Sequence, residues 1–277
     1  MIDDFQFDDP AFEAEISEYR RDEKIAEAKA VVLRFLEEHV NEVFYERQLA
    51  IIFEADYFHW ITVKAVHELA SEGSIESHTL PLSQGVNIRI FRMKANRYWK
   101  RQANQLIKLV QTFSVTEFTH AIGHQGELLV DAALPLAGFR QISRNARSFN
   151  NITWTESGHD LDRIVERESI PYGVEIKNTL PYIPKDELDI KLAICRKLGL
   201  VPLFISRMAP KSYSFQIIQA GGISWILGIQ FYPFGAQRLA ETIRTKLRLP
   251  VGCPARIEDG AITRLLKAIE SQKRRRP

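Results

Sequence analysis

The sequence predicts an α/β fold for the C-terminal half of the chain and a mainly helical domain before it. From about residue 116 onward, apolar segments of strand length alternate with amphipathic segments of helix length, which is the pattern of α/β domains. Before that point, most apolar residues recur at helical spacing. The length of 277 residues and the hydrophobic content of 45% suit one large or two medium globular domains.

The expected organisation has four parts: an acidic N-terminal segment over 1–22, a mainly helical domain over 23–97, a linker helix over 98–115, and an α/β domain with a basic tail over 116–277. The formal net charge is only +2, but basic residues gather in one stretch, and no acidic residue lies between Glu76 and Glu117. This asymmetry is compatible with a polyanionic partner and equally with a solvated face.

Helical periodicity in the first domain predicts helices over 23–38, 44–53 and 60–72, and Gly73 stands where a C-terminal cap belongs. The segments SIESHTL and VNIRIFRM then predict two strands that flank the turn residues PLSQG. Three helices followed by a hairpin resemble a winged-helix domain, with element order rather than a motif as the basis.

The winged-helix resemblance implies that the helix over 60–72 faces a DNA groove, with basic residues of the wing beside it. The candidate DNA contacts of this domain are Lys64, Arg89, Arg92 and Lys94. Recognition helices usually expose several basic or amide side chains, whereas this helix offers only a lysine and two histidines. A winged helix that contacts protein is therefore the alternative.

The second half is expected to contain, in order, helices over 98–113 and 116–136, strands FRQISRN, LDRIVER and GVEIKN, a helix over 187–198, strands LVPLFIS and SYSFQIIQA, and helices over 235–247 and 261–273. Gly138 and Gly199 end two of these helices, and Asn150 and Asn151 form a turn. Helices alternating with apolar strands predict a sheet with helices packed against it.

Charged residues interrupt two of these strands. Because side chains alternate along a strand, Glu175 and Lys177 share one face, while Ile176 points to the other. Asp160 and Asp162 likewise share a face of the preceding strand, and a hairpin would bring one of them to the Glu175–Lys177 pair. Two neighbouring carboxylates repel each other unless a cation lies between them, and Mg²⁺ takes oxygen ligands of this kind.

Asp162, followed after a gap by Glu175 and Lys177, resembles the D-(x)n-(E/D)-x-K signature of the PD-(D/E)XK nuclease superfamily. This superfamily includes restriction endonucleases and archaeal Holliday-junction resolvases. Leu161 stands where the literal signature has proline, so Asp160 stays open as an alternative to Asp162.

Further segments extend this resemblance over about residues 117–220. GELLVDAALPLAGFR is similar to the first helix of resolvase-like members and puts Glu127 at the position of a metal-binding glutamate. Asn178 follows the lysine as in many members, and the expected helix and strand come next. The resemblance therefore implies a restriction endonuclease-like mixed sheet flanked by helices.

The resemblance implies a division of roles within the site. The expected metal ligands are the carboxylates of Asp162, Glu175 and Glu127 and the backbone carbonyl of Ile176. Lys177 is expected to assist the attack of water on phosphorus. Arg140 and Arg144 are candidate phosphate contacts near the site.

A metal-dependent DNA endonuclease is thus expected, either a restriction or defence enzyme or one that processes DNA. Mg²⁺ is the expected cofactor, with Mn²⁺ able to substitute, DNA is the expected partner, and a homodimer is expected. The alternative is a non-catalytic DNA-binding or assembly protein that uses a nuclease-like scaffold, and RNA is also open as a substrate.

The remaining residues suggest less chemistry. Cys195 and Cys253 have neither metal-site nor disulfide spacing and are expected to be unpaired thiols. The aromatic side chains expected in a core or an oligomer contact, or stacked on bases, are Trp225, Phe231, Tyr232 and Phe234. With no apolar run of about 20 residues and no secretory signal, a cytoplasmic protein is expected.

Overall fold

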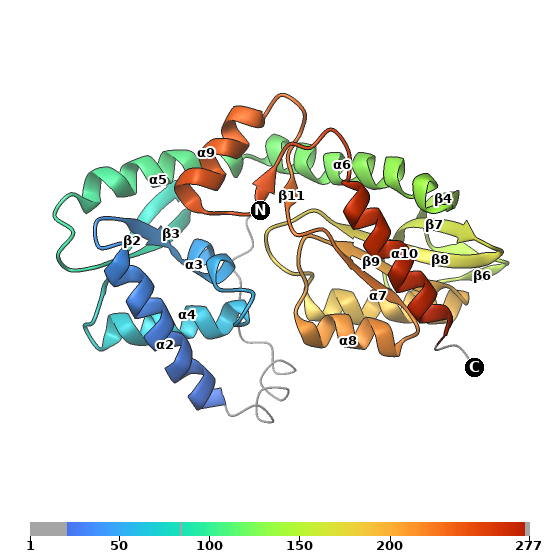
Figure 1. Cartoon of the computed structure of the whole chain (residues 1–277), viewed down its shortest axis with the longest axis horizontal. Coiled ribbons are helices and arrows are strands. Elements are labelled where there is room, and N and C mark those ends of the chain that lie inside the picture. The colour runs from blue at the N-terminus through green and yellow to red at the C-terminus, as the bar shows by residue number, and fades with distance from the viewer. Residues whose placement is uncertain (1–20, 84, 275–277) are drawn as a thin grey trace. The chain divides into compact units, whose positions relative to one another are not determined.

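The computed structural model describes residues 21–83 and 85–274 (Figure 1). Its contacts divide the chain into two units, of which the first comprises the residues up to Thr119 with Thr242–Leu249, and the second comprises His120–Glu241 with Pro250–Pro277. Nearly all of the acidic segment over 1–22, and the end of the basic tail, lie outside the described residues.

The first unit combines helices with a small antiparallel sheet. Its elements are α2 (Arg21–Glu38), β1 (Val43–Tyr45), α3 (Glu46–Ile52), α4 (His59–Ser71), β2 (Glu76–Ser83), β3 (Val86–Arg92) and α5 (Trp99–Phe113). The strand order is β1-β3-β2, with every pairing antiparallel. Ala28 and Val32 of α2 belong to the same buried cluster as Ala65 and Val66 of α4, so the helices form one core.

Two boundaries in this unit differ from the sequence prediction. The helix expected over 44–53 starts later, because Val43–Tyr45 is strand β1 and Phe44 pairs with Phe91 of β3. The segment 242–249 returns to this unit from far along the sequence, and Arg248 contacts the carboxylate of Glu42 at 2.7 Å. Periodicity along the chain carries no information about such distant contacts.

The second unit is a mixed α/β domain. Its elements are α6 (Thr116–Ala133), η1 (Pro135–Ala137), β4 (Arg140–Ala146), β5 (Ser148–Phe149), β6 (Ile152–Thr153), β7 (Leu161–Arg167), β8 (Ile170–Lys177), α7 (Lys185–Leu198), β9 (Val201–Ser206), α8 (Lys211–Gln219), β10 (Ile223–Ile226), β11 (Gln230–Phe231), β12 (Val251–Gly252) and α10 (Asp259–Lys273). Helix α9 (Gln237–Leu247) is divided between the units, because its residues from Thr242 onward belong to the first. The main sheet has the order β10-β9-β8-β7-β4. β4, β7 and β8 pair antiparallel, whereas β8, β9 and β10 pair parallel. The α/β prediction is confirmed at this level.

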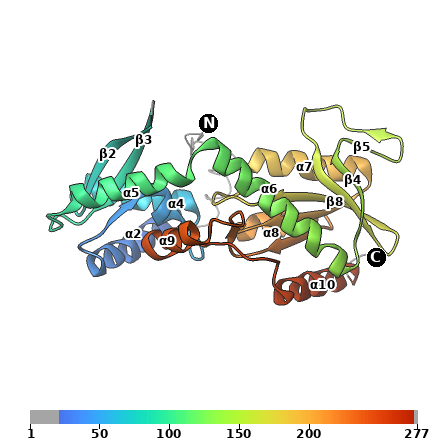
Figure 2. The same ribbon diagram turned by 90° about the horizontal axis from the view of Figure 1, so that it is seen from above.

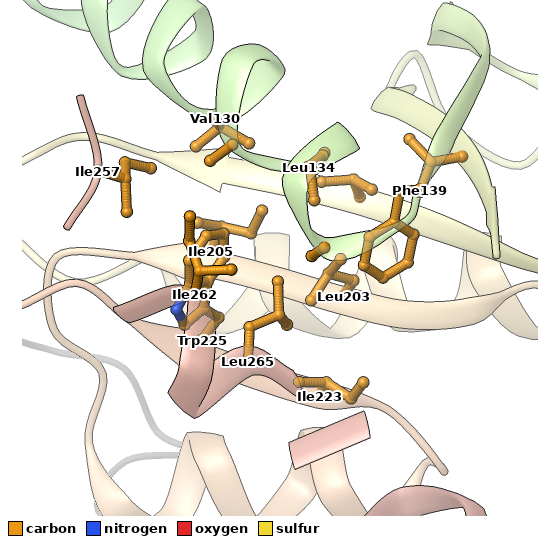
Figure 3. Packing of buried hydrophobic residues seen from close by; sticks show 14 of the residues in the cluster. Val130, Leu134, Phe139, Leu203, Ile205, Ile223, Trp225, Ile257, Ile262 and Leu265 are labelled. Atoms are coloured by element: carbon orange, nitrogen blue, oxygen red, sulfur yellow. The ribbon is translucent and has the colours of Figure 1, made fainter. Parts of the chain in front are cut away.

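Helices cover both faces of this sheet. α6 and α10 lie on one face and α7 and α8 on the other, as Figure 1 shows, and Figure 2 shows α6 from above. Val130 of α6, Leu203 and Ile205 of β9, Trp225 of β10 and Leu265 of α10 interdigitate in the larger core (Figure 3). The opposite face is packed by a second cluster that includes Ile164, Ile194 and Cys195.

The strand predicted for SYSFQIIQA is wrong, because this segment is helix α8. The alternation of Tyr213, Phe215 and Ile217 suggested a strand, but the buried side chains are Tyr213 and Ile217, four residues apart, and Phe215 is exposed. The strand that pairs with β9 is instead β10, and Ile223 lies opposite Leu203.

Both cysteines are unpaired thiols, as expected, with Cys195 buried and Cys253 half-buried. Burial raises the pKa of the Cys195 thiol to about 12, so this side chain behaves as an apolar core group. Within the described part of the chain, no helix has the length and apolar character needed to span a membrane.

Candidate active site

The end of β8 presents charged groups to α7. Val174 and partly buried Ile176 pack in the larger core, so the intervening Glu175 points to the opposite face of the sheet. Glu175 is only 1% exposed. Gly173 lies on the same face, where an added Cβ would come within 2.7 Å of the Cys195 sulfur of α7. Close approach of α7 therefore shields Glu175 from water.

Asp162 on β7 lies beside this carboxylate. Arg163 pairs with Val174, so continuing the antiparallel register by one residue places Asp162 opposite Glu175. The Asp162 Oδ2 atom accepts a hydrogen bond of 2.6 Å from the backbone N–H of Ile176. The structure thus brings the Asp162 carboxylate to the end of β8. For Asp160, the observed contact is that of its backbone carbonyl, which accepts from Lys191 Nζ at 2.6 Å.

Two ammonium groups contact Glu175. Lys177 Nζ lies 3.1 Å from Oε1, and Lys191 Nζ lies 2.6 Å from Oε2. Burial, followed by the charge of Asp162, raises the pKa of Glu175 to about 7 despite the opposing effect of both lysines. Burial also raises the pKa of Asp162, against the Ile176 hydrogen bond and the lysine charges. Burial therefore disfavours the charged form of both carboxylates, and the charge of Asp162 adds to this effect at Glu175.

Lys177 is held between two carboxylates. Its Nζ atom lies 2.7 Å from Glu187 Oε1 in addition to its contact with Glu175. Burial on its own lowers the pKa of Lys177, but the charges and hydrogen bonds of Glu175 and Glu187 raise it above the ordinary value. At neutral pH this side chain is therefore an ammonium cation.

Sequence reasoning missed Lys191 and Glu187. Both lie on α7, where the buried face carries Leu188, Lys191, Leu192 and Cys195 at helical spacing. A lysine inside the apolar stripe of a predicted amphipathic helix is the signal that identifies Lys191, because an unpaired ammonium is seldom buried. Glu187, one turn before Lys191, gives no comparable signal.

Glu127 lies on α6, across the sheet from α7, and contacts a buried arginine. Arg163 Nη2 is 2.7 Å from Glu127 Oε2, and Arg163 Nε is 3.0 Å from Asp131 Oδ1. Arg144 Nη2 lies 2.6 Å from Asp131 Oδ2. The charge of Glu127 contributes to the raised pKa of Asp162, so Glu127 is within electrostatic reach of the site. Its observed partner is nevertheless Arg163.

The basic residues predicted to contact DNA have unequal surroundings. Arg92 is buried, forms an ion pair with Glu76, and donates to the backbone carbonyls of Met93, Lys94 and Asn96. The guanidinium of Arg92 is therefore occupied by internal acceptors, which does not favour the predicted DNA contact. It stabilises the end of the hairpin instead.

The other predicted contacts are exposed. Lys64 lies 4.0 Å from Glu68, and Arg89 lies 3.0 Å from a ring nitrogen of His67. Lys94 is exposed as well. On β4, Arg140 pairs with Glu166 at 3.0 Å. These side chains are accessible, but several already have polar partners.

Aromatic residues near the end of the sheet are mostly core. Trp225, Phe231 and Tyr232 are buried, and Trp225 Nε1 donates to the Ala261 carbonyl at 3.0 Å. Phe234 is 86% exposed. The core interpretation is therefore confirmed for the first three.

The carboxylates of Asp162 and Glu175 supply some, but not all, of the oxygen ligands that a small, hard cation takes. No cluster of three or more His, Cys, Asp or Glu side chains placed to hold a metal occurs among residues 21–83 and 85–274. Mg²⁺, however, is commonly bound through one or two carboxylates and completes its shell with water and phosphate oxygens. Buried Glu175 and half-buried Asp162, each with its pKa raised, fit that mode. Asp162 and Glu175 could therefore hold the ion.

No protein-family model matches this chain, and comparisons with curated proteins and with solved structures give no match.

Proposed function

We propose that the second unit hydrolyses phosphodiester bonds of DNA in a Mg²⁺-dependent reaction, as an endonuclease with a PD-(D/E)XK-like site. The observation that carries the proposal is the position of Asp162 opposite buried Glu175, with the Lys177 ammonium 3.1 Å from the Glu175 carboxylate. Two acids and one cation on adjacent strands match the chemistry of in-line attack on a phosphodiester.

Each side chain has a distinct task in this proposal. Asp162 and Glu175 hold the cation, with Glu127 and the Ile176 carbonyl as further candidates. Mg²⁺ supplies Lewis-acid stabilisation of the phosphate and lowers the pKa of a water nucleophile. Lys177, charged because of its two carboxylate partners, stabilises negative charge that develops on the phosphate oxygens. Glu187 orients the Lys177 ammonium.

A non-catalytic scaffold that binds DNA or assembles with other proteins is the second candidate. It is favoured by the contacts of the acidic groups with cationic side chains of the chain itself, because Glu175 contacts Lys191 at 2.6 Å and Glu127 contacts Arg163 at 2.7 Å. In an enzyme of the proposed kind, Glu175 must exchange the Lys191 contact, at least in part, for the metal.

Cleavage assays separate the two candidates. Supercoiled plasmid, branched DNA and a structured RNA are incubated with the protein in Mg²⁺, Mn²⁺ or EDTA. Cleavage of DNA is expected only with a divalent ion, and it is expected to be lost in Glu175→Gln and Lys177→Met. Glu270→Gln removes a carboxylate from the exposed side of α10 and is expected to cleave normally.

The outcomes differ for each candidate. An enzyme that cleaves DNA equally well after Glu175→Gln would not use this site. A wild-type protein that binds DNA but cleaves none of the substrates supports the scaffold. Cleavage of RNA alone would reassign the substrate.

A further inference from the structure

Helix α5 has two sharply different faces. Ala103, Leu106, Val110 and Phe113 are buried at helical spacing and hold the helix on the first unit. The outer face is polar, and its exposed side chains over the first three turns are Lys100, Arg101, Asn104, Gln105 and Lys108. No acidic residue occurs anywhere between Glu76 and Glu117. The helix therefore presents cations and amides without a single carboxylate of its own.

These outer side chains are not used to hold the fold together. Among the described residues, Lys100, Arg101 and Lys108 form no ion pair with a carboxylate, and the contact of Lys100 is with the Trp99 ring at 5.8 Å. By contrast, two other amides of α5 are bonded to the rest of the first unit: Gln102 donates to the Asn41 carbonyl and Gln111 to the Leu82 carbonyl. Gln102 and Gln111 thus stabilise the fold, whereas Asn104 and Gln105 are exposed on the outer face.

The sequence predicts that helix α4 faces DNA, but α4 lacks an exposed surface of cations and amides. His59 is buried and contacts Glu54 at 3.1 Å, and His67 contacts Glu46 at 2.5 Å. Lys64 is the one basic side chain of α4, and it faces Glu68 at 4.0 Å. Most of α4 is buried against α2 and α3. Its exposed strip is therefore narrow and partly acidic.

Two lysines and an amide form one row on the outer face of α5. Lys100, Asn104 and Lys108 follow one another at intervals of four residues and lie in one row along the helix. At about 1.5 Å per residue, the two lysines are separated by about 12 Å along the axis. Cations at both ends of the row can reach phosphates while the amide between them faces base edges.

Building on the proposed function, we propose that the outer face of α5 is the surface by which the first unit binds duplex DNA. The loop before the helix extends this surface, because Lys94 and Arg97 are exposed and Tyr98 is 77% exposed. The start of α5 is anchored from within, since the Trp99 ring stacks on His78 at 4.0 Å and Arg92 lies over the same ring at 4.9 Å. A helix that is held in place on one side and exposes polar side chains on the other suits rigid binding of DNA.

Binding of a fluorescein-labelled duplex, followed by anisotropy over a range of salt concentrations in EDTA, tests this surface. The double variant Lys100→Ala/Lys108→Ala is expected to bind the duplex several-fold more weakly. The slope of log association constant against log salt concentration is expected to become less steep by about 1.8, or about 0.9 for each lost phosphate contact. Asn104→Ala/Gln105→Ala is expected to weaken binding without changing the slope, because amides displace no counterions.

The matched control is Lys64→Ala/Arg89→Ala, which removes the same number of cations from α4 and the wing. Its affinity is expected to stay within about twofold of wild type, since both side chains already face polar partners. All variants change exposed side chains, and circular dichroism checks that each is folded.

Three results would overturn the proposal: no binding of duplex by the wild type, a larger loss in the α4 and wing control than in the α5 variants, or an effect confined to single-stranded DNA or RNA. The assay contains no divalent ion and measures no cleavage. Failure of this surface therefore leaves the cleavage test of Glu175 and Lys177 standing, and loss of cleavage in those variants leaves this surface untouched.

Discussion

The Asp162 carboxylate accepts a hydrogen bond of 2.6 Å from the backbone N–H of Ile176. This contact joins the start of β7 to the residue between Glu175 and Lys177. It also distinguishes Asp162 from Asp160, whose observed contact is that of its backbone carbonyl with Lys191. Removing the side-chain charge should therefore affect the site at Asp162, which contacts it through its carboxylate, but not at Asp160, which contacts it through its backbone carbonyl.

Replacing Asp162 by Asn is therefore expected to weaken binding of a divalent cation by about tenfold or more, since one of two anionic ligands is lost. Asp160→Asn is the matched control and is expected to leave the affinity within about twofold. Isothermal titration of each protein with Mn²⁺ measures the difference. Equal losses in both variants would contradict the assignment of Asp162.

Lys191→Met is expected to lower the free energy of unfolding by about 3 kcal/mol, because buried Glu175 loses a counter-ion at 2.6 Å. Lys185→Met, one and a half turns earlier on α7, removes an exposed ion pair with Asp189 and is expected to cost about 0.5 kcal/mol. Urea denaturation at pH 8 compares the two. Similar costs would show that the Lys191 contact stabilises little.

Asn178 joins the end of β8 to α6 and to β11. Its Nδ2 donates to the carbonyls of Ile122 and Phe231 at 2.7 Å each, and its Oδ1 accepts from the Phe231 N–H at 2.7 Å. Because three buried hydrogen bonds depend on this side chain, Asn178→Ala is expected to destabilise the second unit by about 3 kcal/mol. Thermal unfolding measures the loss, and a shift no larger than that of an exposed substitution would count against it.

Gly126 allows that side chain to pack against α6. A Cβ atom at this position would lie 2.4 Å from Asn178 Cβ, whereas a Cβ at Gly123, one turn earlier, would meet nothing within 4 Å. Gly126→Ala is therefore expected to destabilise the protein by about 1–3 kcal/mol. Gly123→Ala is expected to stabilise it by up to about 1 kcal/mol through helix propensity. The same sign for both variants in urea denaturation would contradict the packing.

The raised pKa of Glu175 predicts a pH dependence of stability. With a value of about 7 in the folded protein and 4.5 as the ordinary value, the contribution of this group is fully present below pH 4.5 and is lost as the pH rises through about 7. In EDTA, the difference in unfolding free energy between wild type and Glu175→Gln is expected to fall by about 3 kcal/mol across that window. A difference that stays constant, or rises with pH, would contradict the shift.

Much of the second unit was predictable because its core segments have clear periodicity. α7 and β9 were identified from a helical stripe closed by Gly199 and from a continuous apolar run. α8 was misassigned, because three alternating apolar residues fit a strand as well as a helix. Whether this segment forms a helix or a strand depends on which of its side chains the neighbouring elements bury, and periodicity in so short a segment does not show this.

The site was predictable where it is local and unpredictable where it is not. Alternation within β8 placed Glu175 and Lys177 on one face, and the hairpin with β7 placed Asp162 near them. The partners of these groups, Lys191 and Glu187, come from α7, whose approach depends on Gly173 and Cys195. The contact of Glu127 with Arg163 also crosses between a helix and the sheet. Spacing along the chain does not encode such contacts.

The rate of plasmid nicking in Mg²⁺ tests the central claim most directly, with wild type, Glu175→Gln and the surface control Glu270→Gln measured at equal DNA occupancy. We predict that wild type and Glu270→Gln nick at the same rate and that Glu175→Gln is slower by about a hundredfold or more. Equal rates for all three proteins, or none above the EDTA blank, would contradict a nuclease site at Asp162, Glu175 and Lys177.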